Sequence, residues 1–251
     1  MRADQIALQL YTIREACARD LTGTLRAVAA MGYTAVETAG LYGRTAEAMR
    51  ATLDELGLRA VSAHVGHDLF AADPGRVAAD LQTLGASFAV LPSVPASRRG
   101  SLAEARALVA DLNRWGAAIR ATGLRFAYHH HAFEFEPLES STLWELIVSE
   151  TDPALVALEL DVYWAQAGGH DPAALIARHA DRVAMLHLKD LDPAGGRDAP
   201  AGEGTLDWEA ILAAGRAAGA AWYIIEQDTP RDALRDVRVA REQMLLRALP
   251  S

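Results

Sequence analysis

The stretch Ile6-Ala7-Leu8-Gln9-Leu10-Tyr11-Thr12 lies near the start of the chain, and it is a short apolar run that leads into polar residues without any glycine. Its length and composition predict a buried β-strand. An open dinucleotide-binding sheet would place a glycine-rich phosphate turn, G-x-G-x-x-G, directly after such a first strand. The stretch therefore favours a closed barrel over an open doubly wound sheet.

Seven further apolar runs of similar length recur along the chain, and longer segments with helical patterning separate them. Alternation of this kind is typical of βαβ units. With the first run they give eight strands, and 251 residues is an ordinary length for one (β/α)8 barrel. We therefore predict an α/β fold in which one TIM-barrel domain spans residues 1–251. The predicted strands are Ile6–Leu10, Ala35–Glu37, Ala60–His64, Phe88–Leu91, Arg125–His129, Val156–Asp161, Val183–Leu188 and Trp222–Glu226.

Capping residues and glycines mark the helix boundaries. Ser101 and Thr142 each precede a glutamate by three residues, as in a capping box, and Asp-Pro pairs at residues 73–74, 152–153 and 171–172 are also typical of helix starts. A glycine directly follows four of the predicted helices, where a left-handed residue commonly ends a helix. These helices are Thr24–Met31, Thr45–Leu56, Pro74–Leu84 and Leu102–Thr122. A last helix is predicted from about Pro230 to Leu249, and the Gly-, Pro- and Asp-rich stretch Asp190–Thr205 is predicted to be an active-site loop.

The composition argues against several classes of protein. Hydrophobic residues make up 51% of the chain, but no apolar run approaches the ~20 residues of a membrane span, so no membrane partner is expected. The net charge of −9, without clustered Lys and Arg, argues against nucleic acid as a partner. The single cysteine, Cys17, excludes an internal disulfide and a multi-cysteine metal site. Since the chain starts without a signal-peptide pattern, we expect a cytoplasmic protein.

Carboxylates, imidazoles and a lysine follow most of the predicted strands. In a parallel barrel these strand ends meet at one mouth. Because side chains alternate along a strand, Glu159 and Asp161 face the same way, and Lys189 shares a face with His187. Buried carboxylates need a cation or hydrogen-bond donors, and oxygen and nitrogen ligands without a thiolate suit Mn²⁺, Co²⁺, Mg²⁺ or Zn²⁺. The residues at the predicted mouth include Glu37, His64, His67, His129, His130, His131, Glu134, Glu159, Asp161, His187, Lys189, Asp190, Glu226 and Asp228.

Each of these residues also has a purely structural interpretation. A histidine at a strand end often only forms a hydrogen bond within the core. Glu37 can cap the following helix or pair with Arg44, and Lys189 can pair with a neighbouring carboxylate. The three histidines 129–131 must divide between two faces, so at least one is expected to have no role at a metal. Four strand ends that offer ligand types at the same end of the barrel favour a metal site over these separate explanations.

Six segments, taken in order, resemble the xylose isomerase-like barrel superfamily, and most closely the group named sugar phosphate isomerases/epimerases. Inosose dehydratases, hydroxypyruvate isomerases, ketose 3-epimerases and endonuclease IV are relatives within that superfamily. The resemblance spans essentially the whole chain, and the ordered set is more specific than any one motif. The segments are Gln9–Thr12, Tyr128–Phe135, Leu160–Trp164, His187–Asp190, Gly202–Gly204 and Ile225–Asp228.

The resemblance implies one divalent metal ion, held by residues from strands five to eight. Asp161, His187 and Glu226 match the last three ligand positions. Ketose 3-epimerases carry the first ligand, a glutamate, inside strand five, where this chain has Tyr128 or His129. The nearest glutamate, Glu134, is therefore the predicted first ligand, and His131 is its substitute or a supporting partner.

The activity that the resemblance implies is proton transfer next to the carbonyl of a sugar or keto-sugar. The metal would act as a Lewis acid that stabilises an enediolate, and Glu134 or Glu226 would remove the proton. Lys189 would stabilise the enediolate oxygen. The residues implied to contact substrate are Glu37, His64, His131 and Trp164, the last as an apolar wall.

An isomerase or epimerase is thus the predicted function, and three alternatives stay open. If a leaving group lies β to the carbonyl, the same deprotonation leads to elimination, as in a lyase or dehydratase acting on a keto-inositol or keto-glycoside. Phosphodiester hydrolysis would need more His and Asp ligands and a basic surface, which the charge of −9 opposes. A non-catalytic sugar-binding barrel is the third alternative, and the sequence is compatible with a homodimer.

Overall fold

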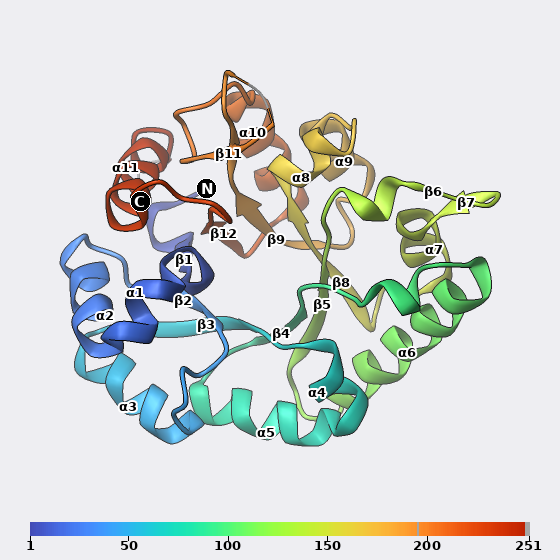
Figure 1. Cartoon of the computed structure of the whole chain (residues 1–251), viewed down its shortest axis with the longest axis horizontal. Helices are drawn as coiled ribbons and strands as arrows, with labels where there is room; N and C mark the ends of the chain where they lie inside the picture. The colour runs from blue at the N-terminus through green and yellow to red at the C-terminus, as the bar shows by residue number, and fades with distance from the viewer. Residues whose placement is uncertain (195, 249–251) are drawn as a thin grey trace.

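A closed barrel of eight parallel strands forms the centre of the computed structural model, which describes residues 1–194 and 196–248 (Figure 1). The strands follow the order β1-β12-β9-β8-β5-β4-β3-β2, and β1 closes the ring because it pairs with both β12 and β2. Figure 1 shows the helices as an outer ring around the strands. The fold is therefore the predicted (β/α)8 barrel. Its strands are β1 (Ile6–Gln9), β2 (Ala35–Ala39), β3 (Arg59–His64), β4 (Phe88–Leu91), β5 (Arg125–His129), β8 (Val156–Asp161), β9 (Val183–Leu188) and β12 (Trp222–Ile225).

The α-helices connect successive strands, with shorter 3-10 helices (η) in some of the connections. The α-helices are α1 (Arg14–Arg19), α2 (Leu21–Ala30), α3 (Ala46–Glu55), α4 (His67–Ala72), α5 (Pro74–Leu84), α6 (Leu102–Arg120), α7 (Leu143–Glu150), α8 (Val162–Ala167), α9 (Pro172–Arg178), α10 (Trp208–Ala218) and α11 (Ala233–Leu246). The 3-10 helices are η1 (Ala3–Gln5), η2 (Leu10–Ile13), η3 (Ala96–Arg98) and η4 (Phe133–Phe135).

The predicted boundaries of the main elements agree closely with the structure. Strands β4, β5, β8 and β9 have their predicted bounds, and the other four strands differ by one or two residues at an end. The glycines predicted to end helices adopt positive φ, at 89° for Gly32, 67° for Gly57, 78° for Gly85 and 88° for Gly123. The last helix is shorter than predicted, and its predicted end at Leu249 lies outside the described residues.

The predicted helix starts are confirmed at four of five positions. Ser101, Thr142, Asp73 and Asp171 each accept a hydrogen bond from a backbone N–H in the first turn of a helix. The prediction for Asp152-Pro153 is wrong, because Asp152 instead accepts a hydrogen bond from Ala154 N in a turn that leads into β8. An Asp-Pro pair caps a helix only where a helical pattern follows, and here a buried strand begins within a few residues.

Two apolar layers support the barrel. The larger one lies between the strands and the surrounding helices and includes Leu158 and Leu186. The smaller one fills the barrel interior with mostly small side chains, among them Ala127, Ala157 and Ile224. Because the interior layer is apolar and packed, polar residues that face inward gather above it, toward the carboxyl ends of the strands.

Two short antiparallel ribbons lie outside the barrel. Strands β6 (Pro137–Leu138) and β7 (Ser141–Thr142) form a hairpin that projects at the rim in Figure 1. Strands β10 (Asp190–Leu191) and β11 (Asp198–Ala199) pair within the stretch that was predicted to be an irregular loop. Nowhere in the described part of the chain is a helix both long and apolar enough to cross a membrane.

Candidate metal centre at the barrel mouth

Inward-facing side chains change from apolar to polar along four strands that are neighbours in the barrel. On β8, Ala157 belongs to the interior apolar layer, and Glu159 and Asp161 follow it at two-residue intervals. Since a strand turns every second side chain to the same face, both acids stand above the apolar layer. The corresponding pairs on the other strands are Ala127 and His129 on β5, Met185 and His187 on β9, and Ile224 and Glu226 at the end of β12.

Four of these side chains converge. His129, Asp161, His187 and Glu226 each offer one ligand atom, and these atoms all lie within 4.8 Å of one another. The register of the sheet accounts for this, because Asp161 is paired with His187 across β8 and β9. Three of the four predicted ligands are therefore brought together, and the residue from β5 that joins them is His129.

The group fits a divalent metal ion. All four side chains are buried, and none is more than 4% exposed. Asp161 Oδ2 forms no hydrogen bond with any described residue, although Lys189 Nζ lies 3.0 Å from it. Because Glu226 and Asp228 contact the same ammonium group, one positive charge faces three carboxylates, and a further cation would compensate the remaining negative charge. Two imidazoles and two carboxylates without a thiolate are ligands that suit Zn²⁺, Co²⁺ or Mn²⁺.

Glu134, the predicted first ligand, lies outside this group. It belongs to η4, and its carboxylate accepts hydrogen bonds of 2.7 Å from both Tyr128 Oη and His131 N. Tyr128 and His129 are adjacent on β5 and point to opposite faces, so a carboxylate bonded to Tyr128 lies away from the ligand side of the strand. Burial raises the pKa of Glu134 to about 7.

The three consecutive histidines divide between the two faces, as predicted. His129 faces the interior. His130 faces outward, where its ring lies 4.9 Å from that of Trp144 and its Nε2 accepts a hydrogen bond from Asp161 N. His131 lies beyond the strand end, and burial lowers its pKa to about 3. His130 is thus the histidine that has no contact with the interior.

Lys189 is fully buried among carboxylates. Its Nζ lies 2.7 Å from Glu226 Oε2, 2.7 Å from Asp228 Oδ2 and 3.0 Å from Asp161 Oδ2. Burial opposes its charge, but these three acids raise the pKa of Lys189 above its ordinary value. Although burial alone would raise it, Lys189 and His187 hold the pKa of Glu226 below its ordinary value. Burial raises the pKa of Asp161 to about 6 even beside this ammonium group.

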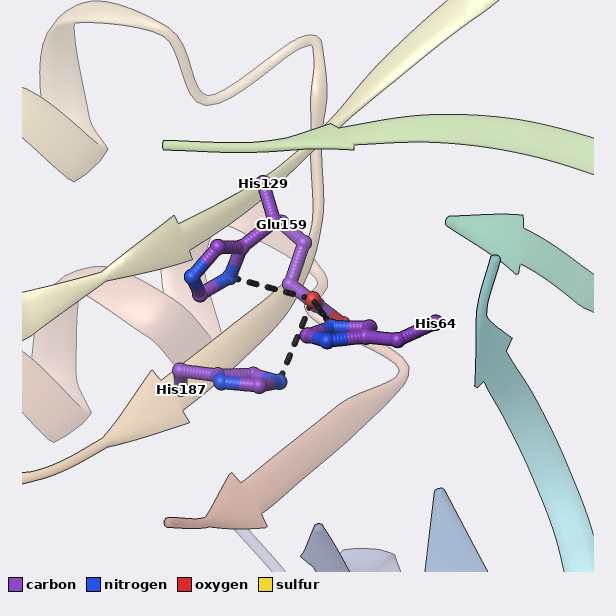
Figure 2. A group of neighbouring side chains, drawn as sticks. All are labelled: His64, His129, Glu159 and His187. Carbon is purple, nitrogen blue, oxygen red and sulfur yellow. Dashed lines mark hydrogen bonds and ion pairs between the residues drawn. The ribbon is translucent and has the colours of Figure 1, made fainter. Parts of the chain in front are cut away.

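A second polar group lies against the first and contains Glu37, His64 and Glu159. Glu159 Oε2 is 2.7 Å from His64 Nε2 (Figure 2). Glu37 Oε2 is 2.7 Å from His187 Nε2. Gln9 Nε2 donates a hydrogen bond of 2.7 Å to the same oxygen of Glu37. The ion pairs of these acids, rather than a salt bridge to Arg44, account for the burial of Glu37.

A cavity of about 490 Å³ opens at the mouth beside both groups. Of the residues predicted to contact substrate, His64 and His131 line it. Glu37 and Trp164 are not among its described lining residues, and Trp164 instead packs near His131, with 5.3 Å between the ring centroids. The cavity is lined by Tyr11, Ala39, His64, Pro92, Ser93, His129, His131, Glu226 and Asp228.

Three residues of this region were placed at the predicted mouth without a ligand, catalytic or substrate role: His129, Glu159 and Asp228. All three were visible in the sequence as inward positions of a two-residue repeat. Asp228 follows Glu226 by two residues, as Lys189 follows His187 and Asp161 follows Glu159. The repeat gives the face of each residue, but it does not tell which members of one face reach the cavity.

The stretch 190–205, predicted to be an active-site loop, is organised by Asp190. Its two carboxylate oxygens accept hydrogen bonds from Gly202 N and Leu206 N, at 2.9 and 3.0 Å, and from Trp208 Nε1 at 2.6 Å. Asp190 also accepts a hydrogen bond from Leu191 N. The described residues of this stretch do not line the mouth cavity. Asp190 therefore holds the connection to α10 in place.

The chain resembles known proteins over most of its length. A curated inosose dehydratase of Geobacillus kaustophilus (strain HTA426) is 28% identical over 191 residues, which cover 66% of this chain and 61% of that protein. The match thus spans about three fifths of the length of that relative.

Solved structures share the fold. A sugar phosphate isomerase/epimerase from Parabacteroides distasonis ATCC 8503 superposes with a TM-score of 0.83 at 23% identity, covering 96% of this chain and 97% of that one. The IOLI protein with a binding zinc atom gives a TM-score of 0.76 at 14% identity, covering 98% and 100%. The family model for the xylose isomerase-like TIM barrel matches residues 25–248. The chain belongs to the xylose isomerase-like TIM-barrel family.

Proposed function

We propose that this protein is a metal-dependent isomerase or epimerase that moves a proton on the carbon next to the carbonyl of a sugar or keto-sugar. The observation that carries the proposal is the convergence of His129, Asp161, His187 and Glu226 beside a cavity of about 490 Å³. A bound divalent ion supplies Lewis acidity, which polarises a carbonyl and stabilises negative charge that develops on its oxygen.

Two carboxylates line the cavity and are placed to handle the proton. Glu226 and Asp228 both reach it, and Glu134 does not. A general base must come within hydrogen-bond distance of the proton that it removes, so we assign that role to Glu226. Asp228, which is the more exposed of the two, is assigned to donate a second proton to the substrate.

Lys189 is assigned a positioning role. It is fully buried and absent from the described cavity lining. We therefore do not assign it the direct contact with a substrate oxygen that the sequence predicted. Its ammonium group contacts both of the proposed proton-handling carboxylates and also Asp161. A buried cation among three acids orients them and offsets their mutual repulsion.

Substrate hydroxyl groups are assigned to the two histidines that line the cavity, His64 and His131. His64 Nε2 is hydrogen-bonded to Glu159, which fixes the ring. His131 lies between Phe133 and Trp164, with ring centroids 5.5 and 5.3 Å away. Trp164 is therefore assigned to support His131, in place of the predicted direct contact with the sugar.

A dehydratase is the second candidate, and the similarity to an inosose dehydratase favours it. Elimination begins with the same removal of a proton beside a carbonyl. Asp228 would then donate its own proton to a departing hydroxyl group, whereas in an epimerase it donates that proton to carbon while Glu226 keeps the one it removed. The two candidates differ in the fate of the Asp228 proton and in the substrate, and they share the site.

Metal content is the first test. Wild type, Asp161→Asn, Glu226→Gln and Glu134→Gln are purified, loaded with Mn²⁺, Co²⁺ or Zn²⁺, desalted and analysed for bound metal. We expect about one equivalent in wild type and in Glu134→Gln, and strong loss in the two ligand variants. The matched Glu134→Gln variant tests the position of the first ligand, because its carboxylate is equally buried but bonded elsewhere.

Activity is tested on keto-sugars and keto-inositols in D2O, followed by NMR. Exchange of the C–H proton with formation of an epimer or isomer supports the first candidate, and formation of an unsaturated product supports the dehydratase. Metal binding without exchange on any substrate of either class would contradict the proposed chemistry. Wild type that retains no metal would contradict the site itself.

A further inference from the structure

Both histidines of the proposed metal centre have a carboxylate oxygen near each of their two ring nitrogens. His187 Nδ1 lies 2.8 Å from Glu226 Oε2, and on the other side of the ring His187 Nε2 lies 2.7 Å from Glu37 Oε2. His129 Nε2 lies on the side of Asp161, at 3.9 Å from Oδ2, while its Nδ1 lies 3.2 Å from Glu159 Oε2. Each imidazole therefore stands between a ligand carboxylate and a carboxylate of the second group.

Glu159 is the centre of that second group. Figure 2 shows its carboxylate among three imidazole rings, with Oε2 at 2.7 Å from His64 Nε2, 3.1 Å from His187 Nε2 and 3.2 Å from His129 Nδ1. The side chain is fully buried, and its other oxygen forms no hydrogen bond with any described residue. Of the three ring nitrogens, His64 Nε2 forms a hydrogen bond with Oε2, and His187 Nε2 is hydrogen-bonded to Glu37. His129 Nδ1 is a close contact without hydrogen-bond geometry. An ionised carboxylate accepts hydrogen bonds only, so a protonated Nδ1 is the form of His129 that suits this contact.

We propose that Glu159 and Glu37 are positioning residues of the metal centre, which fix the tautomer and orientation of its two histidine ligands. The inference rests on the proposed metal site. Glu159 holds the proton of His129 on Nδ1, and Glu37, with Glu159 beside it, holds the proton of His187 on Nε2. The lone pairs of His129 Nε2 and His187 Nδ1 then face Asp161 and Glu226.

The physical reason lies in the two forms of neutral imidazole. One ring nitrogen carries a proton and the other carries a lone pair, and a metal ion binds only the lone pair. A carboxylate at the far nitrogen selects the correct tautomer, fixes the ring plane and makes the ligand more basic. Loss of such a partner typically weakens metal binding by about 10–100-fold.

The two acids are not equivalent. Glu159 contacts both ligand histidines, whereas Glu37 contacts only His187 of the two. Glutamine at position 159 would present an amide NH2 group or an amide oxygen to three ring nitrogens at once. Where the NH2 group faces His129 Nδ1, it favours the opposite tautomer and places a proton on Nε2, the nitrogen that the ion needs. Glu159→Gln should therefore have the larger effect.

The competing interpretation is an ion held by His64 and Glu159 of the second group together with the two ligand histidines. His64, His129, Glu159 and His187 also offer ligand atoms within 4.8 Å of one another. However, His64, His187 and Gln9 already form hydrogen bonds of 2.7 Å with Glu159 or Glu37. Ions in both groups at once would also require His129 and His187 to lose both ring protons. The hydrogen-bonded support is the arrangement that the contacts favour.

The test measures metal affinity directly. Wild type, Glu159→Gln, Glu37→Gln and the control Glu134→Gln are titrated with Co²⁺ and Zn²⁺ against a chromophoric chelator, and the Co²⁺ visible spectrum is recorded. We expect one equivalent in every protein, an affinity about 10–100-fold weaker in Glu159→Gln, a smaller loss in Glu37→Gln and no change in Glu134→Gln. Glu159→Asp, which keeps the charge, should recover part of the affinity.

A measurement on wild type avoids any variant that fails to fold. Long-range proton–nitrogen NMR of the Zn²⁺-loaded protein should find His129 protonated on Nδ1 and His187 on Nε2. The opposite tautomer at either histidine, or unchanged affinity in Glu159→Gln, would overturn this inference and leave the metal site standing. Two equivalents in wild type, one of them lost in Glu159→Gln, would assign the second group to an ion instead. Wild type that binds no metal would overturn both proposals.

Discussion

Glu134 is a buried carboxyl group, and its protonation should make the free energy of unfolding depend on pH. Burial raises its pKa to about 7, so the folded protein binds this proton more tightly than the unfolded chain does. The resulting stabilisation is complete below the unfolded-state pKa and is lost as the pH rises through about 7. Tyr128 Oη and His131 N, which donate to the carboxylate, only partly oppose the effect of burial.

Glu134→Gln removes this titration, and urea unfolding at several pH values measures the effect. The free energy of unfolding of wild type, minus that of the variant, should fall by about 2–3 kcal/mol between pH 5 and pH 8. Every other group titrates alike in the two proteins and cancels in the difference. A difference that stays constant over this range would mean that Glu134 has the same pKa in the folded and unfolded states.

His129, the residue of β5 that joins the proposed metal ligands, could not be identified from the sequence alone. The segment Tyr128–Phe135 contains three histidines and a glutamate, and each is a chemically reasonable ligand. Which one faces inward depends on where the strand ends, because a shift of one residue turns every side chain to the other face. The family resemblance directed attention to a glutamate, whereas the alternation with Ala127 points to His129.

At the scale of elements, strong local signals made the strands and helices predictable. Apolar runs define β4, β5, β8 and β9 almost without ambiguity, with a glycine shortly before β4 and β5, and capping residues define α5, α6, α7 and α9. The pairing of β10 with β11 could not be predicted, because each strand has only two residues and lies in a Gly- and Pro-rich stretch. Its order comes from the hydrogen bonds of Asp190, which bridge residues distant in sequence.

Asp190→Asn should loosen this connection without disturbing the metal centre. An amide keeps one acceptor oxygen but replaces the other with a donor, so two of the buried N–H groups bonded to Asp190 lose their partner, at about 1–3 kcal/mol each. Lys189 and Asp190 point to opposite faces, so metal content should stay unchanged. Urea unfolding and limited proteolysis measure the loss.

Asp192→Asn is the matched control, since Asp192 lies in the same connection and its carboxylate accepts one hydrogen bond from the described residues, from Ala194 N, beside a 3.8 Å ion pair with Arg231. Its free energy of unfolding should stay within about 0.5 kcal/mol of wild type. Equal stability of the two variants would show that Asp190 does not organise the connection.

At the scale of the whole molecule, the proposed ligands occupy one side of the barrel. Strands β12, β9, β8 and β5 are consecutive neighbours, while β2 and β3 lie on the other side of the ring. Binding an ion to the folded state alone stabilises it, by about 2.7 kcal/mol at a free concentration 100 times Kd. An ion would therefore join four strands that are otherwise linked through backbone pairing and side-chain packing.

Hydrogen exchange followed by mass spectrometry, with and without Zn²⁺ or a chelator, tests this asymmetry. For amides that exchange without global unfolding, added metal should slow exchange most in peptides that contain the carboxyl ends of β5, β8, β9 and β12, and least in β2 and β3. Asp161→Asn is the control and should show little change. Equal protection on both sides of the ring would indicate that binding acts only through global stability.

Lys189, enclosed by Asp161, Glu226 and Asp228, is the only lysine in the chain. All other long cationic side chains are arginines, whose guanidinium groups do not undergo amine chemistry under mild conditions. The native surface therefore offers no side-chain amine for acylation or amine-directed crosslinking. Acylation of Lys189 would therefore show that the barrel mouth had opened. The lysine that pairs with three buried acids is thus also a chemical reporter of whether the mouth is intact.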